Sequence, residues 1–309
     1  NTIAHPRVRH VNFISALSNE DLDKRMEHFF HIEDCERLYD QSKSYSQEDK
    51  EAMEKIEASA RKVNGQYEVR VPWRSLPPSM PNNRHQAVAQ LESLRSRFKK
   101  SPEYCHEYTK AITKYEANNF SEQVPLKELH VQPGKGSWLC HHGVKHERKD
   151  LRIVFDASRK CNGISLNGSI MQGPDLLSSL LGILLRFRQR PIAVSADIAS
   201  FFHCVRTPPE DADLARYCWF KDNDPDGPVV DYRMRCHLFG GISSQCCSVY
   251  SVWRTLDDAV HAGAIDEQEA VQILRDLYSD DLLRSYDTVA EAVRSSLLAK
   301  EILWNSKFN

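Results

Sequence analysis

The chain has 309 residues, of which 41% are hydrophobic and 27% are charged, and a formal net charge of −2. Its longest apolar stretch, residues 176–185, is too short and too polar in its flanks to span a bilayer, which excludes a membrane-spanning helix there. Its nine cysteines follow no disulfide-framework spacing, so we expect reduced thiols. A chain of this length can hold two or three subdomains, and its start at Asn1 predicts a fragment or a processed product.

The charges are unevenly distributed along the chain. Residues 20–57 hold 13 acidic and 6 basic residues, whereas residues 145–190 hold 9 basic and 4 acidic residues. An enzyme that acts on nucleic acid needs a positive field only along its groove and its phosphate pocket. The distribution is therefore compatible with nucleic-acid binding. For any single basic residue, an ordinary solvated surface explains it equally well.

The N-terminal part of the chain predicts mainly helices, with one short strand. The expected helices cover 19–30, 46–63, 84–100 and 102–118, and the expected strand covers 67–72. Ser46-Gln-Glu-Asp49 is typical of a capping box at a helix start. From Val124 onward the pattern changes to short strands and helices. The expected elements there are a loop over 163–173, a buried helix over 174–190, a strand over 192–196, a hairpin of 216–220 with 229–235, a helix from near Ser243 and an amphipathic helix over 288–304.

Three carboxylates stand out in this second part. Tyr278-Ser-Asp280-Asp281 can form a tight turn carrying two adjacent acids, and Asp197 follows the apolar strand 192–196. Each motif alone is also compatible with a solvated turn or a strand-end cap. If the two strands are neighbours, they gather three carboxylates, and hard cations such as Mg²⁺ bind such oxygens together with substrate phosphates. Two such ions stabilise the attacking and leaving oxygens of a phosphoryl displacement.

Further motifs occur with these acids in a fixed order. They are Arg152-Ile-Val-Phe-Asp156-Ala-Ser158, Ser165-Leu-Asn-Gly168, Gly173-Pro-Asp-Leu176, Leu185-Arg-Phe-Arg188, Ala196-Asp-Ile198, Phe239-Gly240 and Tyr278-Ser-Asp-Asp281. Together they resemble the reverse transcriptase of Bel/Pao-type LTR retrotransposon polyproteins. Residues 67–72, 84–100 and 140–145 resemble the segment that precedes the polymerase in these elements, so the resemblance extends over residues 26–309.

The resemblance implies an α/β (α+β) fold of the polymerase palm-and-fingers type. The implied architecture is a reverse transcriptase-like right hand, truncated before the thumb, with a helical N-terminal extension. The implied domains are a charged helical linker or scaffold over 1–64, a strand plus two helices over 65–123, fingers over 124–190 and a palm over 191–309, with thumb and RNase H absent.

The resemblance also implies the roles of the site residues. Two Mg²⁺ or Mn²⁺ ions would be held by Asp197, Asp280, Asp281 and the carbonyl of Ile198. The nucleotide-binding residues would be Arg152, Lys145, Ile198, Phe202, Phe239 and Gly240. An Arg fork suits phosphate oxygens, and a ring at Phe202 would clash with a ribose 2′-OH, although a plain core role is the alternative. The stretch Gly241-Ile-Ser-Ser-Gln245 departs from the family, which commonly has Ala-Pro there, and puts the pocket assignment in doubt.

The function implied is RNA-directed DNA polymerase activity on a template–primer with deoxynucleoside triphosphates. The implied partners are the rest of the polyprotein (protease, thumb, RNase H and integrase), in the cytoplasm within a virus-like particle and without a membrane. Two alternatives stay open: a non-catalytic nucleic-acid-binding remnant, and a two-metal nuclease or hydrolase. Because Lys307 precedes the strand in which similar enzymes carry a proton-donating Lys, we expect the 309-residue chain to extend primers only weakly.

Four other motifs favour competing functions less well. Asp222-Asn-Asp-Pro-Asp-Gly227 matches half an EF-hand loop but has Arg233 at the twelfth position, so we interpret it as a hairpin turn. Gly134-Lys-Gly-Ser137 lacks the first Gly of a phosphate loop. Cys140-His-His142 has no second ligand pair for zinc. Asp156-Ala-Ser158 lacks the second half of an aspartic protease, and Asp156 is expected to fix a strand end.

Overall fold

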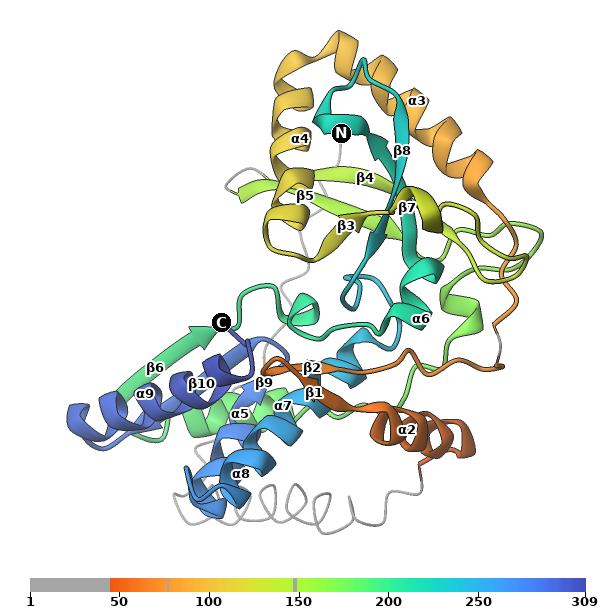
Figure 1. The fold of residues 1–309 in the computed structure, drawn as a ribbon. Helices are drawn as coiled ribbons and strands as arrows, with labels where there is room; N and C mark the ends of the chain where they lie inside the picture. The colour runs from red at the N-terminus through yellow and green to blue at the C-terminus, as the bar shows by residue number, and fades with distance from the viewer. Residues whose placement is uncertain (1–44, 77, 147–148) are drawn as a thin grey trace, which may run out of the picture. The chain divides into compact units, whose positions relative to one another are not determined.

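The computed structural model describes residues 45–76, 78–146 and 149–309. The chain divides into two compact units, Asn1–Ser44 and Tyr45–Asn309, and all described residues belong to the second unit. The helix expected over 19–30 lies outside the described residues. Figure 1 shows the described helices and strands.

One part of the second unit is a five-stranded sheet with the strand order β3-β8-β7-β4-β5. Its strands are β3 (Ser121–Gln123), β4 (Trp138–His146), β5 (Lys149–Asp156), β7 (Arg216–Phe220) and β8 (Val229–Met234). Neighbouring strands pair antiparallel, except that β4 and β7 pair in parallel at Trp138↔Arg216 and Leu139↔Tyr217. Helices α3 (Arg84–Lys100) and α4 (Pro102–Ala117) pack against this sheet (Figure 1).

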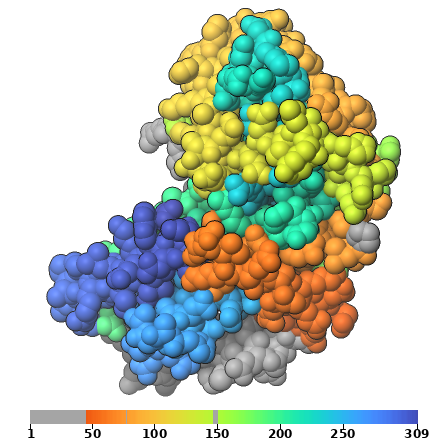
Figure 2. All heavy atoms as spheres, in the orientation of Figure 1, coloured from red at the N-terminus to blue at the C-terminus, as the bar shows by residue number. Residues whose placement is uncertain are grey.

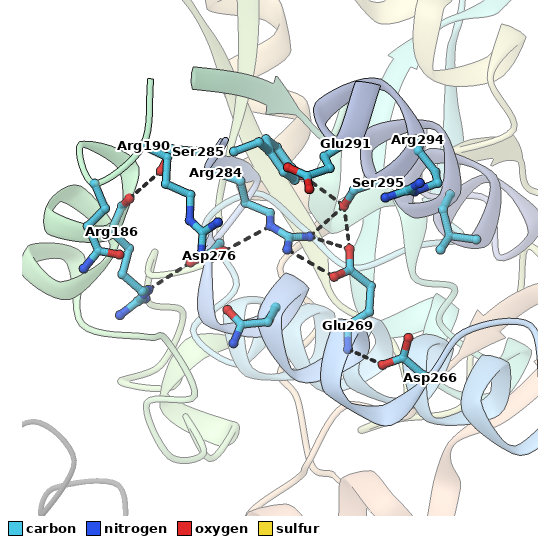
Figure 3. A pocket seen from close by; sticks show the side chains of 14 residues that line it. Arg186, Arg190, Asp266, Glu269, Asp276, Arg284, Ser285, Glu291, Arg294 and Ser295 are labelled. Carbon is cyan, nitrogen blue, oxygen red and sulfur yellow. Dashed lines mark hydrogen bonds and ion pairs between the residues drawn. The ribbon is translucent and has the colours of Figure 1, made fainter. Parts of the chain in front are cut away.

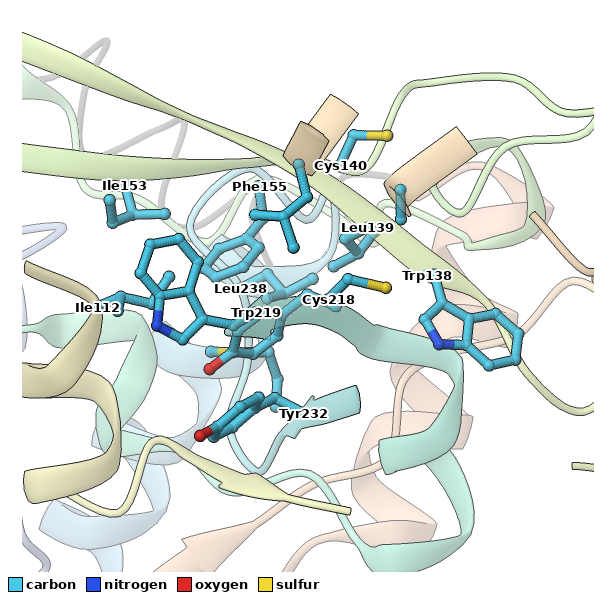
Figure 4. Packing of buried hydrophobic residues seen from close by; sticks show 14 of the residues in the cluster. Ile112, Trp138, Leu139, Cys140, Ile153, Phe155, Cys218, Trp219, Tyr232 and Leu238 are labelled. Carbon is cyan, nitrogen blue, oxygen red and sulfur yellow. The ribbon is translucent and has the colours of Figure 1, made fainter. Parts of the chain in front are cut away.

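The core under these helices is rich in aromatic side chains. Trp219 of β7 stacks on Tyr108 of α4 with ring centroids 5.5 Å apart, and Phe98 of α3 meets Trp219 edge-on at 6.2 Å. Phe155 and Leu139 from the neighbouring strands fill the same cluster (Figure 4). Aromatic side chains bury large areas and prefer such stacked and edge-on contacts, so α3, α4 and the sheet form one core.

The second part is a three-stranded antiparallel sheet with the order β6-β10-β9. Its strands are β6 (Ile192–Asp197), β9 (Leu277–Tyr278) and β10 (Asp281–Tyr286). The helices of this part are α5 (Leu180–Phe187), α7 (Ser244–His261), α8 (Glu267–Arg275) and α9 (Val289–Asn305). The short helix α6 (Pro209–Ala212) lies between β6 and β7 in the sequence. Val252, Ile273 and Leu282 belong to the buried cluster of this part.

The segment that precedes both sheets contributes to the second core. It contains α2 (Gln47–Ser59) and a hairpin of β1 (Arg61–Val63) with β2 (Gln66–Glu68). Ile56 and Val69 are fully buried in the cluster around the three-stranded sheet. The hairpin turn reaches α9, because a Cβ at Gly65 would lie 3.3 Å from the carbonyl oxygen of Asn305. Figure 2 shows these residues, in orange, beside the C-terminal residues in dark blue.

Most predicted elements of the described residues are confirmed. The α3 helix has the predicted bounds, α4 ends one residue earlier, and Ser46 caps α2 by accepting a hydrogen bond from the backbone N–H of Asp49. The hairpin of β7 and β8 is confirmed, with the turn 222–227 between its strands. The mixed five-stranded sheet and the antiparallel three-stranded sheet, both with packed helices, confirm the predicted α/β (α+β) class.

Three predicted elements are corrected. The strand expected over 67–72 covers only Gln66–Glu68, and the helix expected over 46–63 ends at Ser59. The helix expected over 174–190 begins at Leu180, where the hydroxyl of Ser179 caps it by accepting from the N–H of Gly182. Asp175 accepts a hydrogen bond from the N–H of Leu177, and such a local turn competes with helix formation.

The broad apolar face predicted for the 288–304 helix is divided in the structure. The helix is confirmed as α9, with Thr288 and Glu291 forming a capping box. Ala292, Ile302 and Leu303 are buried against the second core. Four apolar side chains of the same helix are instead more than half exposed, namely Val289, Val293, Leu297 and Trp304.

None of the helices in the described residues combines the length and the apolarity that a membrane span requires. The eight cysteines of the described residues are free thiols, and seven of them are buried.

Acid is expected to destabilise the five-stranded part through His141. This side chain is 4% exposed, contacts the hydroxyl of Tyr108 at 2.6 Å through Nδ1 and the carbonyl of Cys218 at 2.9 Å through Nε2, and burial lowers its pKa to about 4. The unfolded chain binds a proton near pH 6.5 and the folded chain does not, so stability is full above pH 6.5 and falls as the pH drops toward 4. We expect His141 to contribute a loss of about 2 kcal/mol between pH 7 and pH 5, measured by urea unfolding, and burial of His203, which also lowers its pKa to about 4, to add to that loss.

The matched variant is His141→Gln, which keeps a hydrogen-bonding amide but does not titrate. It should be less stable at pH 7 and lose less stability between pH 7 and pH 5 than the parent chain. An unchanged pH dependence in this variant would assign the acid sensitivity to other groups.

Candidate functional site

Two strands of the three-stranded sheet bring the predicted carboxylates together. In the antiparallel ladder of β6 with β10, Asp197 and Asp281 are directly opposite each other. Asp280 precedes Asp281 in the turn that joins β9 to β10. The prediction that strand 192–196 and the Tyr278–Asp281 turn are neighbours is therefore confirmed by the strand pairing.

The turn has a defined backbone conformation. Ser279 has a φ of 58°, in the left-handed region that side chains other than Gly, Asn and Asp seldom adopt. The carbonyl of Asp280 accepts a 2.8 Å hydrogen bond from the N–H of Ile198, one residue beyond β6. The hydroxyl of Ser279 lies 3.2 Å from Oε1 of Gln245 in α7. The turn is thus connected to both β6 and α7.

The two faces of the sheet differ in burial. Side chains alternate along a strand, so Asp197 and Ser195 share a face with their partners Asp281 and Leu283. Asp197, Ser195 and Asp281 are exposed. On the opposite face, Leu282, Arg284 and Tyr286 are at most 9% exposed. The carboxylates therefore lie on the open face of the sheet, and the other face is buried along β10.

The acids of this open face interact through their charges. Partial burial raises the pKa of Asp281, and the negative charges of Asp280 and Asp197 raise it further. Like charges directly opposite in a sheet are destabilising, and a bound cation removes that cost. Among the residues that the structure describes, no group of three or more His, Cys, Asp or Glu side chains is arranged to hold a metal ion. Three carboxylates at neighbouring strand ends fit a divalent cation. To bind one, the side chains of Asp197, Asp280 and Asp281 would have to turn toward a common point.

A buried ionic network supports β10 from the other face. Arg284 bonds Glu269 of α8 at 2.7 Å and Asp276 at 3.2 Å, and its Nη1 lies 2.9 Å from Ser295 of α9. Asp276 also accepts a 2.9 Å hydrogen bond from Arg186 of α5. Figure 3 shows this network at a polar pocket of about 570 Å³. The network joins α5, α8 and α9 to the strand that carries Asp281.

The predicted nucleotide pocket contains an aromatic pair. Phe202 lies in a short 3-10 helix (Phe201–Cys204), and its ring centroid is 5.4 Å from that of Phe239. Phe202 is half-buried against the second core, whereas Phe239 is 54% exposed. Gly240 has a φ of 103°, which side chains rarely tolerate, and a Cβ there would meet the carbonyl of Phe155 at 3.5 Å. The structure thus brings the two Phe residues together next to a glycine-dependent turn.

Asn167, which belongs to the Ser165-Leu-Asn-Gly168 motif, also lies at this place. Its Nδ2 donates hydrogen bonds of 3.0 Å to the hydroxyl of Ser158 and to the carbonyl of Gly240. Its Oδ1 accepts a 3.1 Å hydrogen bond from the N–H of Ile242. One amide side chain therefore holds the loop after β5 against the Gly240 turn. The sequence placed Asn167 in that motif and in a predicted loop, but it did not indicate these hydrogen bonds.

The two predicted phosphate-binding cations have different surroundings. Arg152 lies in the middle of β5, is exposed, and has no hydrogen-bond or ion-pair partner among the described residues. Lys145 of β4 is paired with Glu107 at 3.0 Å and Glu103 at 3.7 Å, and the bond with Glu107 raises the pKa of its ammonium group. The guanidinium of Arg152 is the more available of the two.

The competing motifs have structural explanations. Asp156 ends β5 and accepts a 3.1 Å hydrogen bond from the N–H of Ser158, as predicted. In the 222–227 turn, a Cβ at Gly227 would lie 3.0 Å from the carbonyl of Asp224. Cys140 and His141 are buried side chains of β4, and His141 bonds Tyr108 and Cys218 as described above.

Comparisons with solved structures find similar folds at low sequence identity. A crystal structure of a Prototype Foamy Virus protease–reverse transcriptase mutant matches with a TM-score of 0.49 and 14% identity over 94% of this chain and 30% of that chain. The native protein matches with a TM-score of 0.45 and 17% identity over 63% of this chain and 21% of that chain. A foamy viral protease–reverse transcriptase solved with double-stranded DNA matches with a TM-score of 0.46 and 14% identity over 63% of this chain and 29% of that chain.

The chain spans less than a third of the length of these proteins. No protein-family model matches the chain. A search of curated proteins likewise gave no match.

Proposed function

We propose that this chain forms the fingers and palm of a reverse transcriptase, an RNA-directed DNA polymerase encoded by a Bel/Pao-type retrotransposon. It would add deoxynucleotides to a primer 3′-OH by two-metal phosphoryl transfer. The observation that carries the proposal is the direct pairing of Asp197 with Asp281 on the open face of a sheet, with Asp280 adjacent. Like charges directly opposite each other destabilise a sheet, and bound cations would remove that repulsion.

In the proposal, Asp197, Asp280, Asp281 and the carbonyl of Ile198 hold two Mg²⁺ or Mn²⁺ ions. Bound there, the ions supply Lewis acidity to the attacking 3′-oxygen and to the triphosphate. The three carboxylates would provide the negative charge that holds the ions. The register of β6 with β10 places Asp197 and Asp281 together at one end of the sheet. Catalysis is then mainly positioning and charge neutralisation.

The proposed nucleotide site uses the five-stranded part as well. Arg152 presents, on the exposed side of β5, a guanidinium that has no partner among the described residues, and its fork suits two phosphate oxygens. Lys145 is a proposed second phosphate contact. Its ammonium group would have to leave its ion pairs with Glu107 and Glu103 to bind a phosphate. Phe202 and Phe239, with Gly240 behind them, would form the floor under the sugar.

A single-nucleotide incorporation assay tests the proposed function. The purified chain at micromolar concentration is mixed with a labelled primer–template and one deoxynucleoside triphosphate in Mn²⁺ or Mg²⁺. Template-matched addition that requires the metal supports the proposal. Strand cleavage without added nucleotide identifies a two-metal nuclease instead, and metal-independent duplex binding without addition identifies a non-catalytic nucleic-acid-binding protein. Either of those results overturns the proposal.

The Phe202→Val variant should admit ribonucleotides. Removing the ring opens space beside the sugar, so a 2′-OH no longer clashes, and contacts of this size are worth about 10- to 200-fold in discrimination. The measurement is the ratio of incorporation efficiencies for a deoxy- and a ribonucleoside triphosphate. Phe201→Leu is the control, since Phe201 is 3% exposed in the core. If both variants keep the parent ratio, Phe202 is a core residue only.

A further inference from the structure

We propose that Gln245 is a positioning residue, which holds the Tyr278–Asp281 turn through its hydrogen bond with Ser279. This inference rests on the proposed function, because that turn carries two of the carboxylates assigned to the metal ions. It assigns a role to a residue of α7, which is not one of the proposed metal ligands.

The bond joins distant parts of the chain. Gln245 is in the first turn of α7 (Ser244–His261), and its Oε1 accepts a 3.2 Å hydrogen bond from the hydroxyl of Ser279. Ser279 is the residue directly before Asp280. A change in the position of Gln245 therefore acts directly on the backbone from which the carboxylates project.

The turn needs such an external contact. The left-handed φ of 58° at Ser279 is unfavourable for a side chain with a Cβ, by about 1–2 kcal/mol. The strand before it, β9, has only two residues and pairs with β10 alone. On the other side, the N–H of Ile198 bonds the carbonyl of Asp280. Gln245 and Ile198 thus hold the turn from two elements.

The start of α7 is a rigid base for this contact. Cys246 and Cys247, which follow Gln245, are at most 3% exposed. The helix packs closely on the segment before α5, because a Cβ at Gly173 would lie 2.8 Å from Sγ of Cys246. A side chain from so well packed a helix turn can fix a partner at low entropic cost.

The amide nitrogen of Gln245, Nε2, is enclosed by the protein. This atom is buried and has no hydrogen-bond partner among the described residues. Exchanging the amide oxygen and nitrogen would leave the oxygen unpaired instead, so one polar atom is unsatisfied in either orientation. Most buried polar groups in proteins have a hydrogen-bond partner. Among the described residues, the bond with Ser279 is the side-chain hydrogen bond that orients this amide.

A double-mutant cycle on metal affinity tests the proposal. Gln245→Leu, Ser279→Ala and the double variant are compared for Mn²⁺ affinity, from the electron paramagnetic resonance signal of free Mn²⁺. We expect each single change to weaken Mn²⁺ binding about 3- to 10-fold, the range of one hydrogen bond. The double variant should be no weaker than the single ones, because both remove the same contact.

Two controls separate positioning from general packing. Ser248→Ala removes a buried hydroxyl of the same helix that has no hydrogen-bond partner among the described residues, and it should leave Mn²⁺ affinity unchanged. Ser279→Asn keeps a donor and tolerates the left-handed backbone, so it should recover most of the affinity lost in Ser279→Ala. In nucleotide addition, Gln245→Leu should lower kcat and leave the KM for the nucleotide unchanged, since the contact acts on the carboxylates.

Hydrogen exchange in the metal-free protein gives a readout that does not depend on the proposed function. Amides of residues 278–282 should exchange faster in Gln245→Leu and Ser279→Ala than in the parent or in Ser248→Ala. Unchanged exchange, or additive losses of Mn²⁺ affinity in the cycle, would overturn the role of Gln245. If instead the parent chain binds no Mn²⁺ but exchange changes as expected, the turn is held by Gln245 and the proposed function is wrong.

Discussion

Replacing Asp197 by Asn should reduce metal-dependent nucleotide addition by about 10³-fold or more, while the fold remains intact. Asn has the same shape but removes a negative charge, and one preorganised charge in a phosphoryl-transfer site is worth about this factor. The side chain is exposed and directly opposite Asp281, so its neutralisation also removes a repulsion. The measurements are single-turnover addition, Mn²⁺ affinity and thermal unfolding of the metal-free protein.

Asp197→Asn should change metal-dependent addition and metal-free stability in opposite directions, which separates loss of a metal ligand from loss of the fold. Addition and Mn²⁺ affinity should fall, whereas the stability of the metal-free protein should stay equal or rise by less than about 1 kcal/mol. Asp222→Asn is the matched control, because Asp222 is an exposed acid in the turn between β7 and β8. Undiminished addition by purified Asp197→Asn would show that the carboxylate pair is not a metal site.

Replacing Asp211 by Ala should destabilise the protein by about 3 kcal/mol. The carboxylate is 2% exposed and accepts four hydrogen bonds, from Nε and Nη2 of Arg70, the N–H of Val71 and Nε1 of Trp73. Removing one partner of a buried ion pair costs about 3–5 kcal/mol. The guanidinium of Arg70 is 40% exposed and can return to water, so the lower end applies. Denaturant unfolding measures the loss.

Two further variants serve as controls for Asp211→Ala. Asp211→Asn keeps one acceptor oxygen and should cost less than Asp211→Ala. Glu210→Ala changes the neighbouring exposed acid and should alter the free energy of unfolding by less than about 0.5 kcal/mol. Equal stability of Asp211→Ala and the parent would mean that the segment 70–73 is held by apolar packing alone.

The sequence predicted the parts of the site that depend on local pattern. The apolar run before Asp197 and the acids after Tyr278 are signals of strand ends, and the structure pairs those strands. Helices α3 and α4 were predictable because Ser101-Pro102 separates them, with Ser101 capping α4 and Pro102 at its start. These features are decided within a few residues of the chain.

Contacts between distant residues could not be predicted in the same way. Gln245 and Ser279, or Arg70 and Asp211, meet only because the helices and strands pack in one particular arrangement. Polar side chains such as Asn167 carry no periodicity that would mark them as buried connectors. The shortened start of α5 also reflects a local competition, between the turn at Asp175 and helix formation, that composition does not resolve.

The parallel pairing of β4 with β7 has a kinetic consequence for the newly made chain. Trp138 and Leu139 find their partners Arg216 and Tyr217 only after the whole of β6 and α6 has been synthesised. Among the described elements that are synthesised earlier, α3 contacts β4 and α4 contacts β5, so these helices can cover the hairpin first. Pairing over such long sequence separations slows folding and leaves apolar surface open to aggregation. We therefore expect slow closure of the five-stranded sheet to favour self-association of the new chain, and chaperones that delay self-association to raise the yield of native protein.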